Sequence, residues 1–438
     1  MTLVQRNRYF SIVCFLLAGF TTTLLMGGFL FKSADAQEPF RNIVYTESNI
    51  PTENANTILA FEQDANGKLT PLSNSPFPTG GAGIADPTFT TVAGGPFLIA
   101  DNDQNVIVNP EHTQLFAVNS GSNTIAVFDI KKDGTLFPVA GSPFPSGGVN
   151  PESLGLANNV LYVVNRNLDR NNPTQDANGS QPNYTGFRVT RRGQLIPIPG
   201  STVSVPNGSG PTQALISQDK RMLFGAEFTG GLLRSFRILP GGRLEENPNS
   251  PQPLPASEFP TGSPPALPLG LQVHPRQPIL YVGFVTINKV GVYTYNPVTG
   301  ELTFVKAVPN SGQAPCWLIT NRQGTRLYTA NTGNNSVSVY DITDATTPKE
   351  IQKVVLKGNG SATELTLNSN ESFLQVVTRR NSPDTSEGDG VNVLKVNPED
   401  GTLSEVDSSP LPIPSVDGSF PQGIVSLSPE RFAYNVKY

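Results

Sequence analysis

The sequence predicts an all-β fold, a seven-bladed β-propeller of four-stranded antiparallel blades that is closed by strands from both ends of the chain. A run of the type Leu-Tyr-Val-Ala-Asn recurs seven times, and the copies start 46, 62, 57, 47, 46 and 59 residues apart. Glycine and proline, at 41 and 40 of 438 residues, supply frequent turns. A period in the forties that is rich in strand formers is typical of a radial β array. The copies are Leu115–Asn119, Leu161–Asn165, Leu223–Glu227, Leu280–Phe284, Leu327–Asn331, Phe373–Val377 and Phe432–Val436.

The N-terminal segment has the pattern of an export signal. Arg6 and Arg8 precede an apolar stretch from about Ile12 to Phe31, and a small-residue cleavage site follows at Ala34-Asp35-Ala36. We therefore expect residues 1–36 to be a signal peptide and residues 37–438 to be a single propeller domain that is secreted or periplasmic. The alternative is an uncleaved anchor, because a stretch of about 20 apolar residues is long enough to span a bilayer.

Residues 313–356 show how one blade is predicted. Trp317–Thr320 is the inner strand, Leu327–Asn331 the second, Ser336–Tyr340 the third with period-two alternation, and Ile351–Leu356 the fourth. In most other units a glycine turn such as Lys132–Leu136 joins the third and fourth strands.

The two ends of the chain complement one another. Ile43–Thr46, Thr57–Phe61 and Lys68–Thr70 resemble second, third and fourth strands that lack a first, and Gly423–Leu427 resembles the missing inner strand. A blade built from both ends closes the ring and removes its free edges. Phe432–Val436 duplicates a second strand that Ile43–Thr46 already supplies, so the closing blade has either five strands or an N-terminal strand outside it.

Long polar connections are expected at about 73–102, 165–185, 245–266, 379–390 and 406–420. Ser75-Pro76-Phe77-Pro78 and Ser142-Pro143-Phe144-Pro145 recur after fourth strands, so we interpret them as structural connectors. The segment Asn165–Ser180 carries oxygen ligands suited to Ca²⁺ but lacks EF-hand spacing, which favours a solvated loop.

Composition narrows the possible partners. Without residues 1–36 the chain has 27 basic and 34 acidic residues, a net charge of −7, and one cysteine, Cys316. A mild acidic excess without a basic cluster in the sequence argues against nucleic acid, or a membrane surface after signal cleavage. No His or Cys cluster has metal-ligand spacing, so we expect no metal and no cofactor. We expect a monomer.

The repeat resembles the YVTN-type propellers, and the blade layout resembles the lactonase family of seven-bladed propellers, also called cycloisomerase 2, which includes a bacterial 6-phosphogluconolactonase. Enzymes of that family open a blade with Gly-Pro-Arg-His and carry Asn-Glu at the end of the following strand. This sequence has Gly210-Pro211-Thr212-Gln213 and then Ala226-Glu227. The resemblance therefore implies a catalytic role for Glu227, whereas the arginine and histidine are absent.

That departure affects the chemistry. Opening a lactone needs a base near neutrality and a donor for the developing oxyanion, and Thr212 and Gln213 cannot take up a proton at neutral pH. The only histidines, His112 and His274, fall in turns between first and second strands. In a propeller such turns usually lie away from the channel mouth.

A ligand site is also predicted where the inner strands start around the central axis. Aligning the second strands places several polar residues there, and we expect the channel mouth to be formed by Gln104, Glu152, Thr212, Gln213, Glu364 and Gln422. A polar ring with little charge suits water and sugar-like or amide-bearing ligands. Lining a solvated channel is the default role of such residues.

Three functions remain open. The first is an exported binding or interaction module with a degenerate catalytic site, whose partner is a glycan, a small molecule or a protein on one face of the propeller. The second is a hydrolase that opens an extracytoplasmic lactone with 6-phosphogluconolactonase-like chemistry. The third is a structural surface protein without a specific ligand.

Overall fold

The computed structural model describes residues 42–84, 89–92, 95–98, 104–380, 387–416 and 418–427. These residues belong to one unit of the chain, Phe40–Tyr438. The expected signal peptide and the run Phe432–Val436 lie outside the described residues. The described part is built from strands, with two single-turn 3₁₀ helices, η1 (Val285–Ile287) and η2 (Thr332–Asn334), and no α-helix.

Among the described residues, no helix has the length and apolar character needed to cross a membrane.

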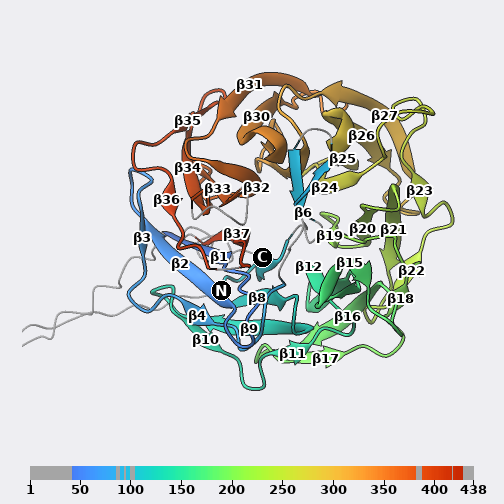
Figure 1. Cartoon of the computed structure of the whole chain (residues 1–438). Coiled ribbons are helices and arrows are strands. Elements are labelled where there is room, and N and C mark those ends of the chain that lie inside the picture. Colours follow the sequence, from blue (N-terminus) through green and yellow to red (C-terminus); the bar gives the residue numbers. More distant parts are fainter. Residues whose placement is uncertain are drawn as a thin grey trace, which may run out of the picture. The chain divides into compact units, whose positions relative to one another are not determined.

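Seven antiparallel sheets follow one another around a ring (Figure 1). In each blade the strands are named in order from the inner to the outer one. Blade 1 contains β37 (Gln422–Leu427), β1 (Asn42–Glu47), β2 (Thr57–Gln63) and β3 (Leu69–Pro71). Blade 2 contains β7 (Val106–Val108), β8 (Gln114–Asn119), β9 (Thr124–Ile130) and β10 (Leu136–Pro138). Blade 3 contains β12 (Pro151–Ala157), β13 (Val160–Asn165), β16 (Asn183–Val189) and β17 (Leu195–Pro197).

The other four blades repeat the order. Blade 4 contains β19 (Leu215–Ile216), β20 (Met222–Glu227), β21 (Leu232–Ile238) and β22 (Leu244–Glu246). Blade 5 contains β24 (Pro268–Val273), β25 (Ile279–Phe284), β26 (Lys289–Tyr295) and β27 (Leu302–Pro309). Blade 6 contains β28 (Pro315–Thr320), β29 (Arg326–Asn331), β30 (Ser336–Asp341) and β31 (Lys349–Val355). Blade 7 contains β32 (Gly360–Leu367), β33 (Phe373–Arg380), β34 (Gly390–Val396) and β35 (Leu403–Glu405). The predicted seven-bladed propeller is confirmed, and blade 6 has the four strands predicted for it.

Short extra strands pair with the third strand of five blades. They are β4 (Phe77–Pro78), β11 (Phe144–Pro145), β18 (Val203–Ser204), β23 (Gln252–Pro253) and β36 (Leu411–Pro412). Ser75 Oγ accepts a hydrogen bond from Ala60 N, and Ser142 Oγ accepts one from Val127 N, both at 2.9 Å. The two Ser-Pro-Phe-Pro segments therefore fasten the outer part of a blade.

Two hairpins were not predicted. The connection at 73–102 contains β5 (Phe89–Val92) paired with β6 (Gly95–Leu98). The connection at 165–185 contains β14 (Leu168–Asp169) paired with β15 (Asn172–Asp176). Both segments were predicted only as long polar connections.

The hydrophobic core lies between the blades. Each of the seven blade-to-blade interfaces holds its own cluster of buried apolar side chains. On β8, for example, Leu115 and Ala117 face blade 1, whereas Phe116 and Val118 face blade 3. Successive side chains of a strand point to opposite faces, so the repeat needs apolar residues at consecutive positions to pack on both neighbours.

The tyrosine of the repeat joins neighbouring blades. The hydroxyl groups of Tyr45, Tyr162, Tyr281 and Tyr328 donate to the backbone oxygens of Gly134, Gly242, Ala345 and Gly401 at 2.6–3.1 Å. Each acceptor lies between the third and fourth strands of the following blade. A buried tyrosine hydroxyl is stabilised by a hydrogen-bond partner, and here the partner fixes the spacing of two blades.

The asparagine at the end of the repeat acts inside its own blade. Asn331 Nδ2 donates to Ser336 Oγ and Ser338 Oγ on β30, both at 3.0 Å. Asn165 Nδ2 similarly reaches Asn183 Oδ1 on β16 at 3.0 Å. This position therefore ties the second strand to the third.

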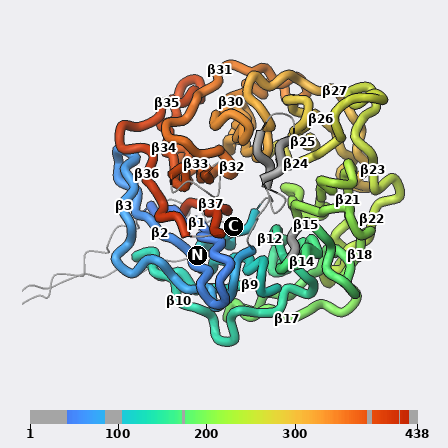
Figure 2. Tube along the Cα trace, viewed as in Figure 1, coloured from blue at the N-terminus to red at the C-terminus, as the bar shows by residue number. Residues whose placement is uncertain are grey.

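The two ends of the chain share blade 1, as predicted. β37 pairs antiparallel with β1 from Leu427 opposite Ile43 to Gln422 opposite Glu47. Figure 2 shows the red β37 beside the blue β1. The closure leaves each four-stranded blade with a neighbour on both sides.

Candidate functional site

A central cavity of about 330 Å³ runs between the seven inner strands, and every blade contributes to its wall. The wall is mostly aliphatic, with Val106, Leu215, Ile319 and Val425 among its residues. Its polar groups are three glutamine side chains, the hydroxyl of Thr366 and the indole of Trp317. None of the described residues that line this cavity carries an ionisable side chain.

A second cavity of about 360 Å³ continues the first toward the turns that join first and second strands. The two share Val108, Gln272, Ile319 and Val425. Among the described lining residues, charged side chains appear only in this outer part, where Arg322 and Glu371 line the wall. The channel therefore changes from a neutral interior to a mixed, charged opening.

Gln104 and Gln213 line the inner cavity just before the inner strands of blades 2 and 4. Gln213 Nε2 donates to Gln104 Oε1 at 3.2 Å, although blade 3 lies between their two blades. Gln213 also bonds the backbone of blade 5, donating to Leu271 O at 3.1 Å and accepting from Leu271 N at 2.6 Å. Of the predicted ligand residues, the structure thus brings Gln104 and Gln213 together at the cavity.

Similar links run around the ring. Asn105 Nδ2 donates to Glu152 O at 3.1 Å, and Ser153 Oγ accepts from Ala214 N at 3.0 Å. Trp317 Nε1 donates to Leu365 O at 2.9 Å. Each side chain bonds the inner strand of the next blade, so holding the channel together is one role of these positions.

Glu152 and Thr212 are fully buried beyond the cavity wall. Glu152 Oε2 lies 3.5 Å from Arg166 Nη1, and both side chains are excluded from solvent. The Arg166 guanidinium stands 5.9 Å from the ring centre of Phe228. Thr212 Oγ1 donates to Ala226 O at 3.3 Å. These two predicted residues lie at the start of the inner strands but do not line the described cavities.

Glu227 is at the end of β20, in the position that Asn331 occupies in blade 6. It is fully buried and accepts a hydrogen bond from Arg234 Nε on β21, and Arg234 Nη1 also bonds Glu246. Burial raises the pKa of Glu227, the hydrogen bond and charge of Arg234 oppose that rise, and Glu246 adds to it. A carboxylate with a raised pKa can exchange a proton nearer neutrality, and its second oxygen, Oε2, has no hydrogen-bond partner.

Glu364 and Glu47 are buried carboxylates whose charges interact. Burial raises the pKa of Glu47 well above its ordinary value, a hydrogen bond from Asn56 opposes the rise, and the negative charge of Glu364 adds to it. Gln422 pairs with Glu47 across β1 and β37. Glu364 and Gln422 are buried, and neither lines the described cavities.

The histidines take two different places. His112 lines the outer cavity, at the end of the channel opposite the predicted mouth. His274 is buried, its Nδ1 accepts from the backbone N–H groups of Arg276 and Gln277, and its Nε2 lies 3.1 Å from Gly324 O. Burial lowers the pKa of His274, so its imidazole is favoured in the neutral form. Its hydrogen bonds stabilise the turn.

Cys316 is buried, and its thiol lies 3.1 Å from Ala314 O. No group of three or more His, Cys, Asp or Glu side chains in the described part of the chain is arranged to hold a metal ion.

Sequence reasoning missed the channel role of Gln272 and the partners of the buried carboxylates. Gln272 lines both cavities and is partly exposed. Arg166 directly follows the Asn of its repeat, and Arg234 directly follows the leucine pair Leu232-Leu233 on β21. A charged side chain at a position that is neutral in blade 6 is the signal that points to both arginines.

The comparisons with known proteins agree with this architecture. Residues 265–364 match the family model described as "Lactonase, 7-bladed beta-propeller". No curated protein matches the sequence.

Solved structures share the fold over most of the chain. A putative 6-phosphogluconolactonase from Bacteroides uniformis has 12% identity and a TM-score of 0.63, covering 88% of this chain and 99% of that one. Another from Bacteroides fragilis has 14% identity and a TM-score of 0.62, covering 90% and 100%. The periplasmic gluconolactonase of Pseudomonas aeruginosa has 15% identity and a TM-score of 0.62, covering 88% and 99%. At such identities the likeness is one of fold. The chain has a seven-bladed propeller fold, and the resemblance to lactonase-type propellers that the repeat and blade layout predicted is confirmed.

Proposed function

We propose that this protein is an exported propeller that binds a neutral, polar ligand in its central channel, with a catalytic site of the lactonase type that has become degenerate. The observation that carries this function is the inner cavity, which all seven blades line. Its described lining residues include three amides, one hydroxyl and one indole but no ionisable group. Its volume of about 330 Å³ suits one small ligand.

The chemistry of the wall selects the ligand class. Amide side chains both donate and accept hydrogen bonds, as sugar hydroxyls and N-acetyl groups require. The aliphatic residues and Trp317 offer surfaces for C–H groups. A charged ligand would lose its hydration without gaining an opposite charge in this inner cavity.

Trp317 provides the test, because it is the only tryptophan of the chain and lines the channel. We expect its fluorescence to respond to at least one member of a panel of neutral mono- and disaccharides and their N-acetylated forms. Gln272→Leu should weaken that binding about tenfold, since it removes a lining hydrogen-bonding group. Gln323→Leu, on an exposed turn outside both cavities, is the matched control. Unchanged fluorescence across the panel, or equal affinities for the two variants, would argue against channel binding.

A lactone hydrolase is the alternative, and the buried position and raised pKa of Glu227 favour it. If the chain hydrolyses lactones, Glu227→Gln should abolish turnover while the folded state persists. The measurement is pH-stat titration against sugar, aromatic and acyl lactones, with circular dichroism to verify folding. Glu245→Gln, which changes an exposed carboxylate on β22, is the control. Full activity in Glu227→Gln removes this residue from the mechanism, and no turnover by the unmodified chain removes the hydrolase function.

A further inference from the structure

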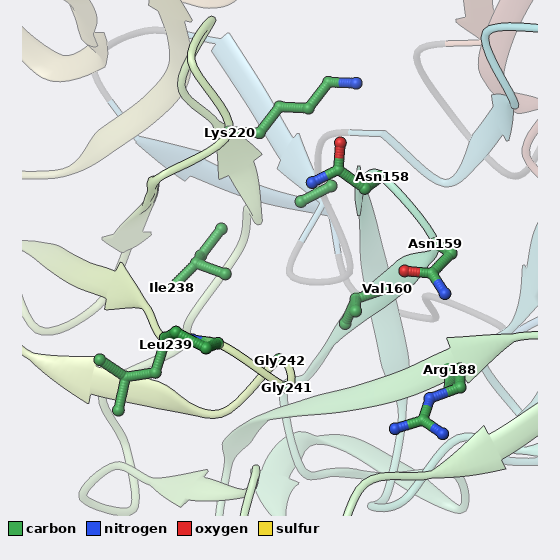
Figure 3. Close-up of a pocket in the computed structure, with 11 residues that line it drawn as sticks. Asn158, Asn159, Val160, Arg188, Lys220, Ile238, Leu239, Gly241 and Gly242 are labelled. Atoms are coloured by element: carbon green, nitrogen blue, oxygen red, sulfur yellow. The ribbon is translucent and has the colours of Figure 1, made fainter.

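A groove of about 610 Å³ lies between blades 3 and 4 (Figure 3). It is on the side of the ring where turns join first to second strands and third to fourth strands. Blade 3 contributes Asn158, Asn159, Val160 and Arg188, and blade 4 contributes Lys220, Ile238 and the turn Leu239–Gly242. Figure 3 shows Val160 and Ile238 on facing walls, with Arg188 and Lys220 at separate ends of the groove. The volume falls in the range of small-molecule sites.

The floor of the groove is held in place. Tyr162 of blade 3 donates its hydroxyl proton to Gly242 O of blade 4 at 3.1 Å. A Cβ atom added to Gly242 would stand 2.7 Å from Ile198 Cδ1 and 3.0 Å from Val160 Cγ2, so the turn packs closely on blade 3. The groove is therefore a fixed feature of the interface between the two blades.

The turns around this groove carry an excess of positive charge in a chain whose net charge is −5. We name these cations the blade 3–4 basic surface; they are Arg188, Arg191, Arg192, Lys220, Arg221, Arg237 and Arg243. They lie at or beside the turns that follow β16, β19 and β21, and antiparallel order brings those turns to one side of the ring.

Two of these cations have acidic partners. Arg221 Nε lies 4.0 Å from Asp219 Oδ2, and Arg237 pairs with Glu245. The remaining five cations make no ion pair with any residue that the structure describes; they are Arg188, Arg191, Arg192, Lys220 and Arg243. The groove thus has two uncompensated cations in its wall and more beside it. The expectation that the chain lacks a basic cluster does not hold for this surface.

We propose that this groove binds an anionic saccharide, a chain of sugar units that bear carboxylate, sulfate or phosphate groups. Arg188 and Lys220 pair with acidic groups at its two ends, and Asn158 and Asn159 bond the sugar hydroxyls. Val160, Ile238 and Leu239 pack against C–H surfaces of the rings. The site is separate from the central channel and does not depend on the function proposed for it.

The residues that line the groove also favour an anionic saccharide over other polyanions. Single-stranded nucleic acids are held by stacking on aromatic side chains, and none of the described residues that line the groove is aromatic. The paired walls and the two asparagine amides favour a narrow hydroxylated chain over a flat lipid surface.

The test measures binding of the full chain to oligogalacturonate and to its neutral methyl ester at low salt. We expect the acidic form to bind and the ester to bind far more weakly. Arg188→Gln with Lys220→Gln should weaken binding by about tenfold or more. Lys68→Gln with Lys132→Gln removes the same charge from exposed turns of blades 1 and 2, and affinity should stay within about twofold.

Asn159→Ala distinguishes a built groove from a diffuse charged patch, because it alters no charge. It should weaken oligogalacturonate binding several-fold. The proposal is overturned if sulfated, phosphorylated and uronic saccharides all fail to bind, or if the Arg188 and Lys220 substitutions leave affinity unchanged. It is also overturned if oligo-dT or vesicles with anionic lipid bind more tightly than these saccharides with the same sensitivity to the substitutions.

Discussion

A chain that ends at Pro421 is expected to lose most of the stability of the propeller. The deletion removes β37, the inner strand of blade 1, and with it all pairing along one side of β1. Ile424 and Leu427 are buried in two separate interface clusters, against blade 7 and against blade 2. Burial of each contributes about 1.5–3 kcal/mol, so these two side chains alone account for about 3–6 kcal/mol. The exposed edge of β1 adds an aggregation hazard.

The matched control is a chain that ends at Leu427. It keeps β37 and removes only residues 428–438. Thermal unfolding followed by circular dichroism should show a large fall in the midpoint, or no cooperative transition, for the Pro421 chain. The Leu427 chain tests whether the fall comes from β37 itself. Equal midpoints for the Pro421 chain and the unmodified protein would show that the ring does not depend on closure through blade 1.

The fold was largely predictable because the same local sequence pattern recurs from blade to blade. The repeat places apolar side chains on both faces of the second strand, a tyrosine that reaches the next blade and an asparagine that bonds the third strand. These contacts depend on residue type at a fixed position, so they recur along the sequence. The tyrosine contact is found in blades 1, 3, 5 and 6, and the asparagine contact in blades 2, 3 and 6. Pairing of Gly423–Leu427 with Ile43–Thr46 followed from the incomplete first unit.

The inner ring was harder to predict because β-bulges shift its register. In blades 1 and 7 the pairing slips between Thr46 and Glu47 and between Ala362 and Glu364. A bulge inserts one residue into a strand and turns the following side chains to the other face. Aligning second strands therefore cannot decide which of two neighbouring inner residues faces the channel. Gln422 was placed by that alignment, and Glu364 was expected near the residues that it placed.

The buried charges depend on partners that are distant in the sequence pattern. Arg234 takes the place that Ser338 has in blade 6, and Glu227 that of Asn331, so an ion pair replaces a neutral hydrogen bond. Either substitution alone would leave a buried charge without compensation. The sequence shows both residues, but only the strand register shows that they meet.

Arg234→Met is expected to lower the free energy of unfolding by about 3–5 kcal/mol at neutral pH, because it leaves the fully buried carboxylate of Glu227 without its cation. The loss should shrink as the pH falls. Without Arg234 the pKa of Glu227 in the folded state rises further, and a protonated glutamic acid needs no cation. A group with a raised folded pKa supports stability below its unfolded pKa and loses that support as the pH rises, so the penalty is largest at high pH.

Denaturant unfolding at pH 5 and pH 8 measures both effects. Arg237→Met, which breaks an exposed pair with Glu245 on the same two strands, is the matched control and should cost no more than about 1 kcal/mol. Glu227→Leu combined with Arg234→Met removes both buried charges and should recover much of the stability, while Glu246 retains the hydroxyl of Ser250 and partial exposure. A cost for Arg234→Met as small as that of Arg237→Met, or one that does not change with pH, would mean that the ion pair does not govern the stability of blade 4.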